Sequence, residues 1–345
     1  MRSRLWAVSA TLLLAACGEG SSGNETAAAA PPPPSGSSPG SLVTTAGVSA
    51  NLAVVAGEIP LAVVRPLDFT RVAYHTTSSR AFASQPVFRH ASLAAVMNCG
   101  ASGTRDVSQA SSDVDSPYTD EAMLVTRTIY ARCVEFAGPP QDPTAATREL
   151  HGVEEFAEAI TADGTALYVA VGDAQAQQPL ERRQQATVGG VEHEEESQAL
   201  GRVDAFVDDS FDVDAQLRLN RTFVVSVDRQ TVATGSYRLG SELGPFRLAS
   251  SNARTAFAID GEFQFQSGRC NPGPAQVATT RDLQYDPVRN RFVGGLLTFT
   301  SSLGTATAEF NADGTVTLMD TQGRTTTLDW RARIGPWEGN PCFEP

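Results

Sequence analysis

The sequence predicts an all-β protein built from antiparallel meander sheets. Residues 211–220 alternate apolar with polar side chains, as a strand with one buried face does. Nearer the C-terminus, glycines fall ten, ten and nine residues apart with no helical segment between them, which indicates short strands joined by tight turns. These glycines are Gly294, Gly304, Gly314 and Gly323, and the strands expected between them are Leu296–Thr300, Thr305–Phe310, Thr315–Met319 and Thr325–Trp330. The pattern leaves open whether the sheet is barrel-like, folds into a sandwich or stays open.

The first β half is expected to span residues 42–172. It opens with two short apolar runs, Leu52–Val55 and Leu61–Val64. Residues 156–171 predict a hairpin that turns at Asp163-Gly164.

A long strand is expected over Ala122–Phe136, after a polar loop from Gly100 to Thr119. The alternation along this strand places five side chains on one face: Met123, Val125, Ile129, Ala131 and Cys133.

Residues 173–197 interrupt the β pattern with Gln-rich and charged sequence, so we expect a polar, exposed connection there. The second β half follows over residues 198–345, and the alternative is one continuous β domain over 42–345. The turn sequence Ala162–Thr165 recurs at Ala312–Thr315, which leaves a duplicated β unit as a further alternative.

The N-terminus has the layout of a secretory signal. Two arginines precede an apolar run from Leu5 to Ala16, which is too short to span a bilayer comfortably. The run ends in Leu14-Ala15-Ala16-Cys17, which resembles the lipobox of bacterial lipoproteins. The resemblance implies that residues 1–16 are a lipoprotein signal peptide and that Cys17 becomes the lipidated first residue of the mature chain.

The same resemblance predicts where the protein lives. In that family Gly18, at the position where an Asp would retain the protein at the inner membrane, implies transport to the outer membrane. Residues 17–41 are rich in Gly, Ser, Ala and Pro, which predicts a disordered tether behind the lipid. Each buried acyl methylene contributes about 0.8 kcal/mol, so we expect a lipid-anchored domain that faces the periplasm or the cell surface.

Charge and composition exclude several function classes. The formal net charge is −13, whereas binding to nucleic acid needs a basic surface, so we expect no nucleic-acid partner. The chain contains no Lys, and its 26 basic residues are all Arg. Schiff-base catalysis and the phosphate-binding Lys of a P-loop are therefore excluded.

Four cysteines remain in the mature chain besides Cys17. An even number of cysteines in an exported protein predicts disulfides, here with three possible connectivities. We favour the pairs that join neighbours within each half, Cys99–Cys133 and Cys270–Cys342.

Two acidic groups are candidates for chemistry. His193 with Glu194–Glu196 has the composition of a metal site, but the second His of a helical zinc site would fall at Ser197. The densest carboxylate group is Asp204–Asp214, in which Asp208 and Asp209 are candidate ligands for weak calcium binding. Because the Gly and Glu of an EF-hand loop are missing, we expect charged surface at both groups, no other metal and no cofactor.

The expected function is non-enzymatic binding of a small ligand or an envelope partner by a disulfide-stapled β domain. No motif for a nucleophile with its base occurs outside the low-complexity tether. One alternative is an envelope hydrolase that uses paired carboxylates from Asp204–Asp214 or Glu194–Glu196. Another is a purely structural envelope lipoprotein.

Overall fold

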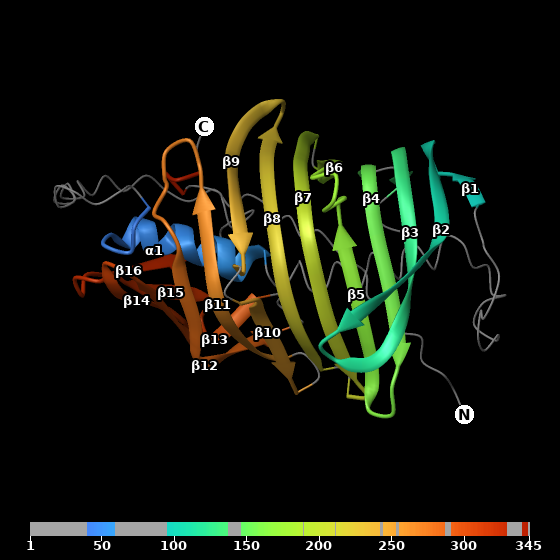
Figure 1. The fold of residues 1–345 in the computed structure, drawn as a ribbon. Coiled ribbons are helices and arrows are strands. Elements are labelled where there is room, and N and C mark those ends of the chain that lie inside the picture. The colour runs from blue at the N-terminus through green and yellow to red at the C-terminus, as the bar shows by residue number, and fades with distance from the viewer. Residues whose placement is uncertain are drawn as a thin grey trace, which may run out of the picture.

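The computed structural model describes residues 40–58, 95–136, 146–188, 190–210, 212–241, 244–252, 255–286, 291–329 and 340–343. Over these residues the chain forms one antiparallel sheet of 16 strands, which confirms the all-β prediction (Figure 1). The strands follow one another across the sheet from β1 to β16, as a meander does.

The strands have the following bounds. The first eight are β1 (Ala95–Asn98), β2 (Ser102–Ser116), β3 (Thr119–Phe136), β4 (Ala146–Ile160), β5 (Gly164–Val171), β6 (Leu180–Val188), β7 (Val191–Asp208) and β8 (Val213–Val227). The other eight are β9 (Gln230–Leu239), β10 (Phe246–Ser251), β11 (Ala256–Gln266), β12 (Ala275–Asp286), β13 (Arg291–Ser301), β14 (Gly304–Phe310), β15 (Thr315–Met319) and β16 (Thr325–Asp329).

Two strands of the sheet are split in the middle. β5 and β6 pair with successive parts of the same two neighbours, β4 and β7, and residues 172–179 leave the sheet between them. We call residues 172–179 the excursion. In the same way β9 ends at Leu239 and β10 begins at Phe246, and both pair with β8 and β11.

One helix lies inside the curve of the sheet. α1 (Thr45–Leu52) continues into the π-helical segment η1 (Ala53–Glu58), and in Figure 1 α1 lies within the curl of β11 to β16. Thr44 caps α1, because its hydroxyl accepts a hydrogen bond of 3.0 Å from the backbone N–H of Gly47. A side chain at Gly47 would collide with the carbonyl oxygen of Ser41, 1.9 Å from the position of a Cβ, so only glycine fits there.

The main core joins the helix to the sheet. Val48, Leu52, Val54 and Val55 are completely buried, and they belong to the same cluster as the apolar side chains of β8 to β15. Each such side chain contributes roughly 1.5–3 kcal/mol when it leaves water. We call the face of the sheet that carries this core the inner face.

The sequence prediction was wrong in three segments. Leu52–Val55 is helical rather than part of a β-rich start, because a short apolar run buried on all sides fits a helix as well as a strand. The expected loop from Gly100 to Thr119 is mostly β2, and the expected connection over 173–197 is mostly β6 and the start of β7. These strands carry polar side chains on both faces because much of their surface is only half-buried, so they lack the alternation that marks a strand.

The strand β3 also differs from its expected pattern. Met123 and Val125 are buried as predicted, but Ile129 is 43% exposed and Tyr130 is buried in its place. The register shifts between Tyr130 and Cys133, where Arg132 adopts a φ of +48° as the extra residue of a bulge. Cys133 therefore packs with Tyr130 and not with Met123.

Other sequence predictions are confirmed. The disulfides are Cys99–Cys133 and Cys270–Cys342, with Cα atoms 5.4 Å and 5.2 Å apart. The hairpin of β4 and β5 turns where Thr161 N–H donates to the Gly164 carbonyl, and β14, β15 and β16 coincide closely with the expected strands. Gly294 is the exception among the spaced glycines, since it lies within β13.

Several predicted features lie outside the described residues. These are the signal peptide, Cys17, nearly all of the tether and the run Leu61–Val64. None of the helices in the described part of the chain is long and apolar enough to cross a membrane.

Candidate functional site

A groove crosses four strands on the face of the sheet opposite the main core, and most of the residues that line it have polar side chains. Its volume is about 340 Å³. We call this side of the sheet the groove face. The groove is lined by Pro179, Gln198, Leu200, Asn220, Arg221, Thr222, Ser236, Tyr237, Arg238, Gln264, Phe265 and Gln266.

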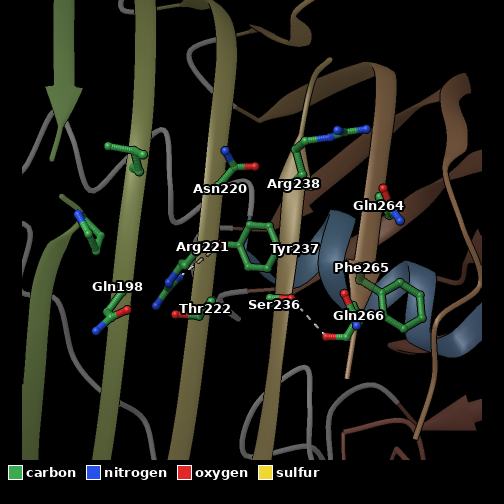
Figure 2. Close-up of a pocket in the computed structure, with 12 residues that line it drawn as sticks. Gln198, Asn220, Arg221, Thr222, Ser236, Tyr237, Arg238, Gln264, Phe265 and Gln266 are labelled. Carbon is green, nitrogen blue, oxygen red and sulfur yellow. Dashed lines mark hydrogen bonds between the residues drawn. The ribbon is translucent and has the colours of Figure 1, made fainter. Parts of the chain in front are cut away.

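The strand register arranges the groove side chains in two rows. In the first row each residue lies directly opposite the next on the neighbouring strand: Gln198, Thr222, Ser236 and Gln266. The second row is formed in the same way by Leu200, Asn220, Arg238 and Gln264. Figure 2 shows the labelled members of both rows on their four strands, β7, β8, β9 and β11.

The alternation of the strands explains why the rows are polar. Between them lie Arg221, Tyr237 and Phe265, which are at most 8% exposed because they point to the inner face. Arg221 is held there by Tyr237, whose hydroxyl accepts its hydrogen bond at 3.3 Å, and by Glu195. These three buried side chains therefore hold the strands against the core. The residues before and after each of them in the sequence point to the opposite face and line the groove.

The charges in and beside the groove are compensated by neighbours. Arg238 forms an ion pair of 3.2 Å with Glu262 on β11. Gln198 donates a hydrogen bond of 3.3 Å to Glu181 on β6. The groove is thus rich in hydrogen-bonding groups. The guanidinium of Arg238, the one that lines it from this face, is already paired with the carboxylate of Glu262.

The excursion forms one end of the groove. It begins at Gly172, whose φ of +79° is in the left-handed region, and a Cβ there would lie 2.8 Å from Leu200 Cδ1. It ends at Pro179, which lines the groove.

The base of the excursion is held by Arg127, which binds Asp173 and Glu155, each at 2.8 Å. A hydrogen bond from the Ala176 amide, together with Arg127, lowers the pKa of Asp173 below its ordinary value.

The tip of the β2–β3 hairpin folds over the same face, beside the groove. Tyr118 donates a hydrogen bond of 3.1 Å to Asp214 on β8 and stacks on Phe206, with ring centroids 6.2 Å apart. Arg202 on β7 donates to the carbonyl of Asp115 and binds both carboxylate oxygens of Asp204 at 2.6 Å. Figure 1 shows this hairpin crossing the neighbouring strands. Burial and the charge of Asp214 raise the pKa of Tyr118, so the hydroxyl stays protonated and remains a donor.

A second cluster of charges is buried on β2, β3 and β4. Glu135 accepts hydrogen bonds from Arg105 at 3.2 Å and from Arg148 at 3.1 Å. The Tyr130 hydroxyl donates to Glu154 at 3.1 Å. Burial raises the pKa of Glu154, and the Tyr130 hydrogen bond and the charge of Arg148 offset this only in part.

Of the two candidate calcium ligands, Asp208 has a structural role in the turn from β7 to β8. The carboxylate of Asp208 accepts hydrogen bonds of 2.8 Å from the backbone N–H groups of Ser210 and Asp212. Asp209 is exposed beside it. Within the described ranges, no three His, Cys, Asp or Glu side chains come together as a metal site would require.

The candidate carboxylates for hydrolysis are spread over ion pairs. Glu194 binds Arg183 at 2.5 Å, and Glu195 binds Arg221. Because these two glutamates are consecutive in β7, they point to opposite faces of the sheet and have different partners. Asp204 is engaged by Arg202 and Asp214 by Tyr118. The structure therefore does not bring these residues together as one site.

Comparisons with known proteins find no likeness. No protein-family model matches the chain, and neither a curated protein nor a solved structure matches it significantly.

Proposed function

We propose that this chain is a lipid-anchored envelope protein whose β domain binds its ligand in the polar groove without catalysing a reaction. The anchor rests on the resemblance of Leu14-Ala15-Ala16-Cys17 to a lipobox. The binding role rests on the groove, in which two rows of side chains meet across four strands.

The alignment of the rows is the observation that carries this proposal. Amides and hydroxyls from four strands surround a hollow of about 340 Å³, so a ligand lying in it meets several hydrogen-bonding side chains at once. The inner side chains beneath, Tyr237 and Phe265, are at most 3% exposed, so packing in the main core holds the strands that form the floor of the groove. A rigid site loses less conformational entropy when it binds.

Native mass spectrometry of the full chain tests this proposal. The protein is extracted from the membrane and compared with the variant Thr222→Trp, which places a large ring in the groove from an exposed position. Thr231→Trp is the matched control, because Thr231 is exposed on β9 and does not line the groove. We expect a noncovalent added mass in the wild type and in Thr231→Trp that is lost in Thr222→Trp. A bare mass in the wild type, or an added mass in all three proteins, contradicts the proposal.

A further inference from the structure

The hydrogen-bonding groups of the groove can both donate and accept. On the groove face, four of the lining side chains are amides and two are aliphatic hydroxyls: Gln198, Asn220, Gln264, Gln266, Thr222 and Ser236. An amide offers two donors and one acceptor, and a hydroxyl offers one donor and accepts as well. A ligand that carries hydroxyls along its whole length fits such a lining, because each hydroxyl also donates and accepts.

The spacing of the residues within each row, which is the strand spacing of any sheet, fits a repeating ligand. Neighbouring strands lie about 4.8 Å apart, which is close to the length of one sugar unit in an extended β-1,4-linked glycan. Each of the four strands contributes one residue to each row. A linear glycan lying across the strands would therefore meet one pair of side chains for each sugar, and four sugars would span the groove.

The charge of the groove selects among glycans. Arg238 is already paired with Glu262, and the whole chain has a net charge of −13, so an anionic polymer would gain little attraction and would be repelled at long range. Leu200 and Pro179 supply an apolar end against which the carbon face of a sugar ring or an acetamido methyl can pack.

We infer that the groove binds an uncharged, extended β-1,4-linked glycan across β7, β8, β9 and β11, an inference that rests on the function proposed above and names its ligand class. Asn220 and Gln264 in the second row and Thr222 and Ser236 in the first row make the hydrogen bonds to the sugars. The recognition depends on hydrogen bonds, so affinity grows with the number of strands that the glycan crosses.

Titration calorimetry with β-1,4-linked oligomers of N-acetylglucosamine tests the inference. The full chain is held in a detergent without a sugar head group, so that the detergent does not compete for the site. We expect affinity to rise about fivefold for each sugar added from two to four, as about 1 kcal/mol for each added hydrogen bond predicts, and to change less than twofold from four to six.

Matched variants tie the binding to the groove. Asn220→Ala and Gln264→Ala each remove one hydrogen-bonding side chain and should weaken binding of the tetrasaccharide about fivefold or more. Gln284→Ala is the control, because Gln284 is an exposed Gln on β12 that does not line the groove, and it should bind as the wild type does. Unchanged melting temperatures of these surface variants confirm that each is folded.

Three results would overturn the inference. They are the absence of tetrasaccharide binding, equal binding by the groove variants and the wild type, and an affinity that does not depend on chain length. If the oligosaccharides fail while the native protein still carries a mass that Thr222→Trp removes, the groove binds another class of ligand, such as an extended peptide. In that case the glycan inference is wrong and the proposed binding function stands. If both experiments fail, both proposals are wrong.

Discussion

The hydroxyl of Tyr118 donates a hydrogen bond of 3.1 Å to Asp214, 96 residues further along the chain. This contact closes the tip of the β2–β3 hairpin onto the face of the sheet that carries the groove. Tyr118→Phe keeps the stacking on Phe206 but removes the hydrogen bond, so we expect the tip to open more often and the domain to lose about 0.5–1.5 kcal/mol at most. Hydrogen exchange of the amides from 114 to 121 should accelerate in this variant. Exchange at the wild-type rate would show that the contact does not hold the tip.

The excursion depends on a glycine. A Cβ at Gly172 would lie 2.7 Å from the Gln178 carbonyl oxygen and 2.8 Å from Leu200 Cδ1. Gly190 is the matched control, because its φ of +86° is equally left-handed and a Cβ there meets nothing within 4 Å. We expect Gly190→Ala to cost about 1 kcal/mol through backbone strain and Gly172→Ala to cost roughly 1–3 kcal/mol more through crowding. Urea unfolding of the two variants measures the difference, and equal losses would contradict the crowding expected at Gly172.

The disulfide Cys270–Cys342 holds the beginning of the described domain. A Cβ at Gly40 would lie 2.9 Å from Cys270 Cβ, and Asn51 on α1 donates a hydrogen bond of 3.2 Å to the Gly40 carbonyl. Replacing both cysteines with Ala should cost about 4 kcal/mol by the chain-entropy model and should loosen α1.

Removing the other disulfide serves as the comparison. The double variant Cys99→Ala, Cys133→Ala should lose about 4 kcal/mol too, because the cost depends only on the logarithm of the loop length, yet α1 should keep its protection. Hydrogen exchange of residues 45–52 distinguishes the two variants. Equal loosening of α1 in both would contradict the local role of Cys270–Cys342.

Burial of Glu154 makes stability depend on pH. Its pKa is raised above the ordinary value of 4.5, so its contribution to stability is fully present below that pH and is lost as pH rises through the raised value. Glu154→Gln keeps an acceptor for Tyr130 and removes the titration. We expect the melting temperature of the variant relative to the wild type to increase from pH 4 to pH 8. A difference for Glu154→Gln that stays constant with pH would refute the assignment.

The proposed lipid anchor has its own test. In cells supplied with an alkyne-labelled palmitate, the wild type should take up the label and Cys17→Ser should not. Gly18→Asp should keep the label but move the protein from the outer to the inner membrane, because an Asp at this position retains members of the lipoprotein family. A labelled Cys17→Ser variant would contradict the anchor.

Sequence alone predicts those parts of the fold in which one face is buried. Val213, Ala215 and Leu217 are buried while Asp214 and Arg218 are exposed. The alternation of apolar and polar residues there therefore correctly predicts a strand with one buried face. The pairing of Cys270 with Cys342 is the one that the sequence favours among three connectivities, because it joins neighbouring cysteines of the second half. By contrast, β2, β6 and the start of β7 lack a continuous buried face, so their sequence looks like a loop. Yet β6 pairs with β7 in unbroken register, and β2 pairs with β3 through three register shifts.

The groove could not be predicted in this way. Gln198, Thr222, Ser236 and Gln266 are far apart in the chain, and each alone is an ordinary polar residue on the exposed side of a strand. Only the register of four strands aligns them, and register depends on turns and on the split between β9 and β10, which the sequence does not reveal. The carboxylates singled out by density, such as Asp208, instead satisfy backbone amides in a turn.

The central claim is that the groove contacts a ligand in the cell, and photo-cross-linking in living cells tests it most directly. A photoreactive amino acid is placed at Thr222 inside the groove or at the exposed control position Thr231. We predict a discrete adduct of the full chain from Thr222 that is absent from Thr231. No adduct from Thr222, or the same adducts from both positions, would contradict the claim.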